Sequence, residues 1–417
     1  MRHIFLWLTG IVVVVCIIGS VAVIGGAPAR PAKVSDKIAA ADTAFGFDLF
    51  QRLVKQEKDR NVFISPTSIA LALEMTYNGT AADVKRSMAK VLHLGAMDLA
   101  QVNQGNAALM SSLRKPGPGV ELQVANSLWA RKGIRFKRDF VQRNRQFYDA
   151  RLTTLDFASP RAKDTINGWV KDNTKGRIPS IIDSISRFDI MFLVNAVYFK
   201  GQWTDKFDAA KTKDHPFTLP GGKTKTVKMM SRHGRYDYLE TPEFQAIRLP
   251  YGKGRLSMYV FLPKLQPGVA GALPKSDPGL GAFCAGLNAD KWQQWMSQLK
   301  SREGTISLPR FKLEYKAELK DPLVMLGMKP AFNPTDTGFA PLTPARGVYI
   351  SKVTHKTFVE VNEKGTEAAA ATSVGIAVTS MPSGPPPFTM VVDHPFFCAI
   401  RDKETGAVVF MGAVTRP

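Results

Sequence analysis

Residue types that usually perform catalysis occur in this sequence, but not in the patterns that catalysis requires. No Gly-x-Ser-x-Gly, His-Glu-x-x-His or Cys-x-x-Cys pattern is present. Gly222-Lys223-Thr224 resembles the end of a phosphate-binding loop, but Phe217 stands where that loop needs its first glycine, so we interpret it as a hairpin turn. A Ser/His/Asp triad stays open, because its members need not be close along a chain. The histidines are scattered without metal-ligand spacing, at His3, His93, His215, His233, His355 and His394. We therefore expect neither a cofactor nor a metal ion.

The segment with the most unusual pattern is a long connection, residues 363–387, between predicted strands at Thr357–Val361 and Phe388–Val392. Connections longer than about 12–15 residues are uncommon in compact domains and are usually functional. The Ala- and Pro-rich composition alone is typical of a disordered loop. The first half, however, alternates in an extended chain. One face carries small, uncharged side chains before Val374, whereas Glu367 falls on the other face. Such a stretch can enter a β-sheet as an additional strand without a steric penalty.

The elements that must position this segment divide unevenly along the chain. Helical spacing begins at Asp36 and recurs after Pro66, where Ser65 or Thr67 can cap a second helix. Strand patterns dominate later. The nearly continuous apolar run Met191–Phe199 indicates a strand buried on both faces. Helices in the first half and strands in the second favour an α+β fold with mostly antiparallel sheets. Further strands are predicted at Leu256–Leu262, Thr305–Leu313, Phe396–Arg401 and Ala407–Val414.

Composition and the N-terminus limit the compartment and the source of stability. The 417 residues are 45% hydrophobic, with 3 Cys and a net charge of +21, which excludes wholesale disorder and a disulfide framework. The charge admits polyanions as partners. Residues 1–29 are predicted to be a signal peptide or an uncleaved membrane anchor, because about 20 apolar residues also suffice to span a bilayer. Residues 30–35 are predicted to be a flexible spacer, and 36–417 one domain. We expect a secreted, periplasmic or extracellular protein, with membrane attachment only if the segment is uncleaved.

From Asp36 to Pro417 the sequence resembles the serpins, the family of serine protease inhibitors. Five blocks, in the same order along the chain as in the family, carry the resemblance: Asn61-Val62-Phe63-Ile64-Ser65-Pro66-Thr67-Ser68-Ile69, Leu193-Val194-Asn195-Ala196-Val197-Tyr198-Phe199-Lys200-Gly201-Gln202-Trp203, Leu308-Pro309-Arg310-Phe311-Lys312 with Leu326-Gly327-Met328, Glu363–Thr372, and Asp393-His394-Pro395-Phe396-Phe397.

The resemblance implies the family's α+β fold, with three β-sheets, eight or nine helices and an exposed reactive-centre loop. It implies a monomeric suicide substrate rather than an enzyme. A serine or cysteine protease cleaves the loop and becomes acylated, and the hinge half of the loop then inserts into the large sheet and distorts the trapped protease. Non-inhibitory serpins, which act as binding or chaperone-like modules, are the alternative. They tend to carry bulky, charged or Pro residues in the hinge, and the inward-facing hinge positions Thr366, Ala368 and Ala370 carry none here.

The resemblance also assigns roles to residues. The scissile bond lies at a nearly constant distance beyond the hinge glutamate, and counting from Glu363 gives Thr379-Ser380, so we expect an elastase-like or subtilisin-like target. No Arg or Lys lies between Lys364 and Arg401, which disfavours trypsin-like enzymes. The remaining assignments are a hinge at Glu363, Gly365, Thr366, Ala368 and Ala370, a shutter beneath the parting strands at Ser65, Ser68, Asn195 and His355, and a breach, where the loop first enters the sheet, at Trp203.

One segment is unusually basic. Aromatic residues are interleaved at core-like spacing, so the cations are typical of the solvated side of an ordinary helix. The alternative is a site for a polyanion such as sulfated polysaccharide or nucleic acid. The candidate residues are Arg131, Lys132, Arg135, Lys137, Arg138, Arg143 and Arg145.

Overall fold

The computed structural model describes residues 33–186, 188–265, 278–334, 337–366 and 386–417. Residues 33–417 belong to one compact unit. The helices of the described residues are α1 (Val34–Glu57), α2 (Pro66–Tyr77), α3 (Ala82–Val91), α4 (Leu99–Leu113), α5 (Arg138–Tyr148), α6 (Ala162–Asn173), α7 (Pro278–Ala285), α8 (Ala289–Gln298) and α9 (Lys320–Leu323). No helix among these residues is long and apolar enough to span a membrane. The predicted signal or anchor segment lies outside the described residues.

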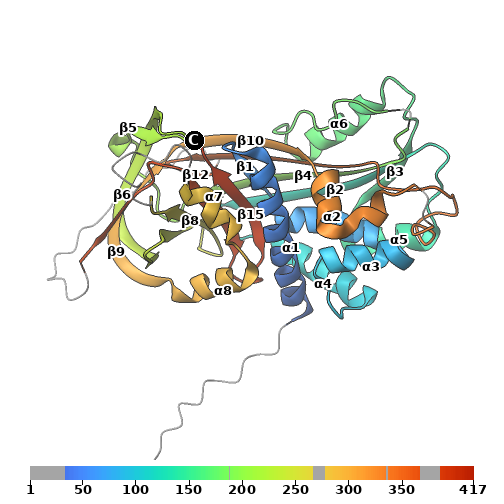
Figure 1. Cartoon of the computed structure of the whole chain (residues 1–417), viewed down its shortest axis with the longest axis horizontal. Coiled ribbons are helices and arrows are strands. Elements are labelled where there is room, and N and C mark those ends of the chain that lie inside the picture. Colours follow the sequence, from blue (N-terminus) through green and yellow to red (C-terminus); the bar gives the residue numbers. More distant parts are fainter. Residues whose placement is uncertain (1–32, 187, 266–277, 335–336, 367–385) are drawn as a thin grey trace, which may run out of the picture. The chain divides into compact units, whose positions relative to one another are not determined.

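The strands form two hydrogen-bonded sheets (Figure 1). A six-stranded sheet has the order β10-β11-β12-β4-β2-β3, and a nine-stranded sheet has the order β1-β15-β14-β8-β7-β6-β9-β13, with β5 paired to β6. Their bounds are β1 (Val62–Ile64), β2 (Val120–Arg131), β3 (Arg151–Leu155), β4 (Met191–Gln202), β5 (Lys213–Thr218), β6 (Thr224–Glu240), β7 (Phe244–Pro250), β8 (Leu256–Pro263), β9 (Lys300–Pro309), β10 (Phe311–Glu318), β11 (Lys352–Asn362), β12 (Gly365–Thr366), β13 (Phe388–Val391), β14 (Phe396–Asp402) and β15 (Val408–Val414).

The α+β prediction is confirmed, and most strand pairs are antiparallel, as expected. Where three sheets were expected, the strands form two hydrogen-bonded sheets, because the long strand β6 makes the nine-stranded sheet continuous. Its first residues pair with β5, Met229–Tyr238 pair with β9, and its last residues pair with β7. The hairpin turn predicted at Gly222-Lys223-Thr224 joins β5 to β6.

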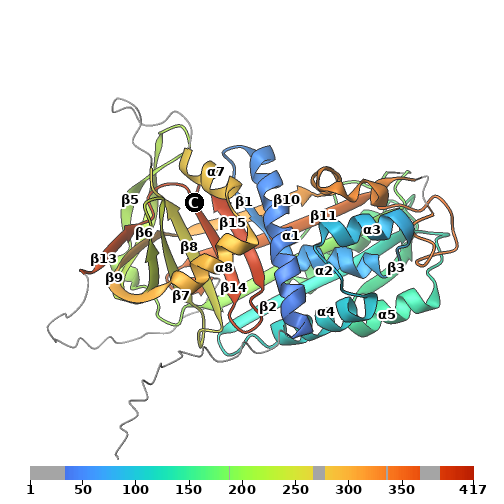
Figure 2. The ribbon, with the colours of Figure 1, turned by 60° about the horizontal axis from the view of Figure 1, so that its bottom comes forward.

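The six-stranded sheet is buried on both faces, as the apolar run of β4 predicted. Alternate β4 residues contribute to different clusters of buried side chains. Leu193 and Val197 belong to the main core, whereas Phe192 and Val194 pack in a second cluster with Ile166 of α6. In Figure 2 helices α2 to α5 lie together along the sheet on the main-core side. Figure 1 places α6 above the sheet strands, away from those helices. The sheet is therefore the middle layer of three.

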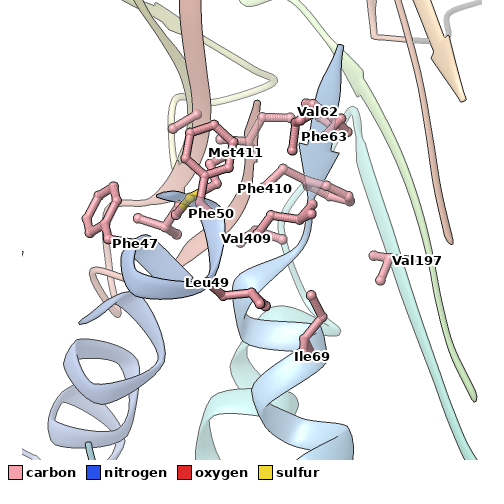
Figure 3. Close-up of a cluster of buried hydrophobic side chains, with 14 of the residues drawn as sticks. Phe47, Leu49, Phe50, Val62, Phe63, Ile69, Val197, Val409, Phe410 and Met411 are labelled. Carbon is pink, nitrogen blue, oxygen red and sulfur yellow. The ribbon is translucent and has the colours of Figure 1, made fainter. Parts of the chain in front are cut away.

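The main core joins the two sheets where α1 and α2 meet β15. Phe50 of α1, Phe63 of β1 and Phe410 of β15 are buried together (Figure 3). Phe63 and Phe410 stack with ring centroids 5.4 Å apart. Val197 of β4 is buried in the same cluster. Burying these side chains is the chief source of stability, because each large apolar side chain contributes roughly 1.5–3 kcal/mol.

One predicted strand differs from the structure. The strand predicted over Thr305–Leu313 is wrong as a single element. It is the end of β9 and the start of β10, which lie in different sheets and are divided at Arg310. The buried apolar positions change phase at this point, from Ile306 and Leu308 to Phe311 and Leu313, so the change of sheet leaves a mark in the pattern. His215-Pro216 lies inside β5, whose only partner in the sheet order is β6; proline is tolerated on such an edge.

Candidate functional site

The predicted hinge enters the six-stranded sheet. Gly365 and Thr366 form β12, which pairs with the end of β11 on one side and the end of β4 on the other. Farther along, β11 pairs directly with β4, Lys352–Phe358 against Phe192–Tyr198, and we call this paired stretch the seam. The two strands are therefore parted only at the end that receives β12. Ala368, Ala370, Thr379 and Ser380 lie outside the described residues.

The first hinge residues fit closely into this opening. Thr366 is fully buried, and its hydroxyl lies 2.7 Å from the phenol oxygen of Tyr251. Gly365 has a φ of +144°, and a Cβ there would lie 2.0 Å from the carbonyl oxygen of Gly201. Only glycine is compatible with this backbone and this contact. The identity of Gly365 is thus dictated by the entry of the chain into the sheet.

Glu363 anchors the hinge through an ion pair in which the carboxylate is buried and the partner, Arg310, is partly exposed. Its carboxylate accepts hydrogen bonds from Arg310 Nε at 2.7 Å and from Thr212 Oγ1 at 2.5 Å. Burial raises the pKa of Glu363, but these hydrogen bonds outweigh burial and leave its pKa below the ordinary value. The carboxylate is therefore charged at neutral pH, and Arg310 is its counter-ion.

Trp203 holds the backbone of the same turn. Its indole nitrogen donates to the carbonyl of Asn362 at 2.9 Å, and its backbone N–H donates to that of Lys364 at 3.0 Å. Its ring stacks on Tyr251 with centroids 4.4 Å apart. We call the following set the entry site: Trp203, Thr212, Tyr251, Arg310, Glu363, Gly365 and Thr366. Sequence reasoning missed Thr212, Tyr251 and Arg310, although Arg310 lies within one of the five blocks that resemble serpins.

The four predicted shutter residues meet under the seam, and we call them, with Asn126 of β2, the seam cluster. His355 of β11 lies opposite Asn195 of β4 in the register of the seam, and Asn195 lies opposite Asn126. His355 Nδ1 is 2.5 Å from Asn195 Oδ1, and Asn195 Nδ2 donates to Asn126 Oδ1 at 2.6 Å and to the carbonyl of Ser68 at 3.0 Å. Hydrogen bonds therefore join these side chains of the adjacent strands β11, β4 and β2 to one another and to α2.

The hydrogen bonds determine the state of His355. The backbone N–H of Ser65 donates to Nε2 at 3.1 Å, so Nε2 must be unprotonated and Nδ1 carries the proton that faces Asn195. Burial lowers the pKa of His355 to about 3, in agreement with a neutral ring. A strand that inserts between β4 and β11 must break the contact between His355 and Asn195.

Lysine side chains of β10 and β11 hold the connection that follows α6 against the sheet. Lys352 and Lys356 of β11 donate to the carbonyls of Ser184 at 3.2 Å and Ser180 at 3.1 Å. Lys316 of β10 contacts Asp183 at 2.5 Å. A new strand in the seam therefore has to displace or accommodate this connection.

The predicted basic cluster divides into structural and exposed residues. Arg143, which is half-buried, donates to the carbonyl of Asn78 at 3.2 Å, and Arg131 donates to that of Asp189 at 2.8 Å. These two arginines attach α5 and β2 to their neighbours. The other five cations are exposed: Lys132, Arg135, Lys137, Arg138 and Arg145. Within the described ranges, no group of three or more His, Cys, Asp or Glu side chains is arranged to hold a metal ion.

Comparisons with known proteins agree with this architecture. Residues 40–417 match the family model described as "Serpin (serine protease inhibitor)". Human leukocyte elastase inhibitor is 36% identical over 390 residues, which cover 92% of this chain and 100% of that protein. The structure of the thermophilic serpin tengpin in its native state is 30% identical with a TM-score of 0.81, covering 91% of this chain and 94% of that one. Human thyroxine-binding globulin, complexed with its hormone, is 25% identical with a TM-score of 0.82, covering 92% of this chain and 100% of that one.

Proposed function

Because the chain belongs to the serpin family of protease inhibitors, we propose that it traps a target protease by inserting its cleaved loop into the six-stranded sheet. The observation that carries this proposal is β12, a two-residue strand that already lies between the ends of β4 and β11. Each further residue of the loop would pair with the same two strands, β4 and β11. In the uncleaved chain the loop is held at both ends, and cleavage would free its first half to insert.

The direction of insertion supports this mechanism. β12 is antiparallel to both neighbours, and β4 and β11 are parallel to each other, so a strand between them gains backbone hydrogen bonds on both edges. Each net hydrogen bond contributes about 1 kcal/mol. The uncleaved chain is then kinetically trapped short of its most stable state.

The target would be an elastase-like or subtilisin-like protease that cleaves Thr379-Ser380. The small residues before this bond suit a small apolar pocket, and the similarity to leukocyte elastase inhibitor supports the same choice. The test incubates the full chain with elastase-like, subtilisin-like and trypsin-like enzymes and looks for an SDS-stable complex on a gel. Cleavage without any such complex would reject the trapping mechanism and favour a non-inhibitory binding role.

A polyanion is the second proposed partner, at the exposed cations on and before α5. Lys132, Arg135, Lys137, Arg138 and Arg145 form no ion pair among the described residues, so their charge is available to a ligand. Binding of heparin should weaken steeply with salt. The double variant Arg138→Glu/Arg145→Glu should lose most of this binding, whereas Arg143→Gln should affect stability instead. Equal binding by the double variant and the wild type would reject this site.

We also propose that the chain acts outside the cytosol, because its first residues have the pattern of an export or anchor segment. N-terminal sequencing of the protein from its native host tests this. A mature N-terminus near residues 22–30 indicates cleavage, and an intact Met1 in the membrane fraction indicates an anchor.

A further inference from the structure

Two carboxyl groups are buried together in the helical half of the molecule. Asp42 of α1 is 1% exposed and Glu74 of α2 is 0% exposed. None of their four carboxyl oxygens accepts a hydrogen bond from the described residues. The amide of Asn106 in α4 is close enough to Glu74 to oppose a rise in its pKa, but its hydrogen bonds go to Val102 O and Tyr148 Oη. This pair belongs neither to the entry site nor to the seam cluster.

Such a pair cannot carry two negative charges. A buried, unpaired carboxylate costs several kcal/mol, and a second one beside it repels the first. Burial raises the pKa of Glu74 to about 8. Burial raises the pKa of Asp42 well above its ordinary value, and the charge of Glu74 adds to this rise. The two groups titrate as one unit, so the proton belongs to the pair.

The surroundings offer amides and phenols rather than a counter-ion. Tyr77 of α2 and Tyr148 of α5 both feel the charge of Glu74, which together with burial raises their pKa values. Asn78 and Asn103 bond to each other through both side chains. Arg143 directs its guanidinium to the carbonyl of Asn78, at the end of α2.

The other ionisable groups on α1, α2 and the elements packed against them are exposed, are engaged elsewhere or stand at the ends of their elements. In α3, Lys85 lies over the Tyr77 ring and Asp83 pairs with Arg86. Asp48 of α1 pairs with His93 at the surface. β15 carries no ionisable residue. The remaining groups on the neighbouring strands are Glu121, which pairs with Lys175, Arg131, which bonds Asp189, and Lys200, near the end of β4.

Helix α2 connects this pair to the seam. All of its residues from Pro66 to Tyr77 are buried. Its first residues contact the seam cluster: the N–H of Ser65 bonds His355, and the carbonyl of Ser68 accepts from Asn195. Glu74 lies six residues beyond Ser68, about 9 Å along the same helix. Helix α2 is thus one continuous buried element between the pair and the side chains that close the seam.

We propose that Asp42 and Glu74 share one proton and form a pH-sensitive switch, whose deprotonation loosens α1 from α2 and thereby destabilises the closed sheet. In this mechanism the proton leaves the pair for solvent, and no other bond changes. The unfolded chain releases this proton at lower pH than the folded chain does, so unfolding releases a proton over the window between them. The protonated pair therefore stabilises the fold fully at pH values below the pKa that these carboxyl groups have in the unfolded chain. This stabilisation is lost as the pH rises through the pKa of the pair in the folded chain.

The test compares the full chain with Glu74→Gln and Asp42→Asn in chemical unfolding between pH 5.5 and pH 8.5. The unfolding equilibrium constant of the wild type, relative to Glu74→Gln, should rise with pH by up to about tenfold per pH unit. Asp83→Asn removes an exposed carboxylate from the neighbouring helix and should follow the wild-type curve. Parallel curves for the wild type and Glu74→Gln would overturn the proposal.

Two measurements keep the proposal testable if a variant fails to fold. Calorimetry of the wild type in two buffers of different ionisation enthalpy should detect about one proton released on unfolding at pH 7. No net release would overturn the proposal. Infrared spectra of the folded wild type at pH 7 should contain the band of a protonated carboxyl group, and this band should shift in whichever of the two variants folds. Absence of this band in the wild type would also overturn it.

A functional readout rests on the proposed inhibitory activity. Inhibitory capacity should be lost faster during storage at pH 8.5 than at pH 6, and Glu74→Gln should abolish this difference. Proton release without a change in the rate of loss would mean that the switch exists but does not reach the seam. The proton count and the infrared band do not depend on inhibition, so a protein without inhibitory activity would leave them interpretable.

Discussion

The entry site and the seam cluster are both buried polar sites between β4 and β11, but they hold the strands in different ways. At the entry site the strands are parted, and a charged pair, Glu363 with Arg310, holds the incoming chain. At the seam the strands are paired, and neutral groups, His355 with Asn195, hold them together. In the proposed insertion mechanism, the entry site would guide the start of insertion, and the seam cluster would be a barrier that insertion must cross.

Cleavage of the loop tests this comparison most strongly. A cut between Glu367 and Ser380 should free the hinge half to replace the seam contacts with a complete central strand. If about ten backbone hydrogen bonds are gained, the melting midpoint should rise by at least about 10 °C. Limited proteolysis followed by thermal melting measures this. An unchanged or lower midpoint in the nicked protein would mean that the seam does not open.

Thr366→Arg should block insertion at the entry site. The side chain of Thr366 is fully buried against Tyr251, and an arginine would bring an unpaired charge there at a cost of several kcal/mol. Acylation would continue while insertion stalls, so the number of inhibitor molecules consumed per protease trapped should rise steeply. Glu367→Arg is the matched control, because alternation predicts an outward side chain. Equal effects at both positions would defeat the alternation argument.

Asn195→Ala should weaken the seam without touching the entry site. It leaves His355 Nδ1 and Asn126 Oδ1 buried without their partner, at a cost of about 2–4 kcal/mol in the free energy of unfolding. Chemical unfolding measures this loss. Asn173→Ala, an exposed position at the end of α6, should cost under about 1 kcal/mol. Similar losses in both variants would show that the seam cluster contributes nothing special.

The pH dependence of stability tests whether His355 of the seam cluster is neutral in the folded protein. His355 is neutral in the fold with a pKa of about 3, but its unfolded pKa is about 6.5. Its contribution is therefore complete above pH 6.5 and is lost as pH falls toward 3, by up to about 1.4 kcal/mol per pH unit. The carboxyl pair of α1 and α2 acts in the opposite direction, so the measurement is the difference between wild type and His355→Gln. His233→Gln, on the surface, is the control. A difference that does not vary with pH would contradict a neutral, buried His355.

Arg310→Gln should have the smallest effect, at the entry site. The Arg310 side chain is 44% exposed, so solvent screens its pair with Glu363, and we expect a loss of about 1–2 kcal/mol. A double-mutant cycle with Glu363→Gln isolates the coupling between the two. Coupling near zero would leave the hydrogen bonds of Trp203 as the main support of the hinge turn.

Local patterns predicted the elements better than their partners. The apolar run of β4 and the helix after Pro66 were predicted, because burial on both faces and a capped apolar helix leave direct marks on the sequence. β11 was predicted only over Thr357–Val361 but begins at Lys352. Lys352, His355 and Lys356 interrupt its apolar pattern, since the lysines reach the connection after α6 and the histidine enters the seam cluster.

The sequence by itself determined the family and predicted a small, uncharged inward face of the hinge and four of the five seam-cluster residues, because these follow from ordered motifs and from the alternation of an extended chain. Only the tertiary structure decided that β12 is already paired, that Arg310 is the counter-ion of Glu363, and that Asp42 and Glu74 are both buried and near enough for their charges to interact. Each of these depends on a contact between residues far apart in the chain. Periodicity reports which side of an element is buried, whereas the partner on that side is set by strand register and helix packing, which no local pattern encodes.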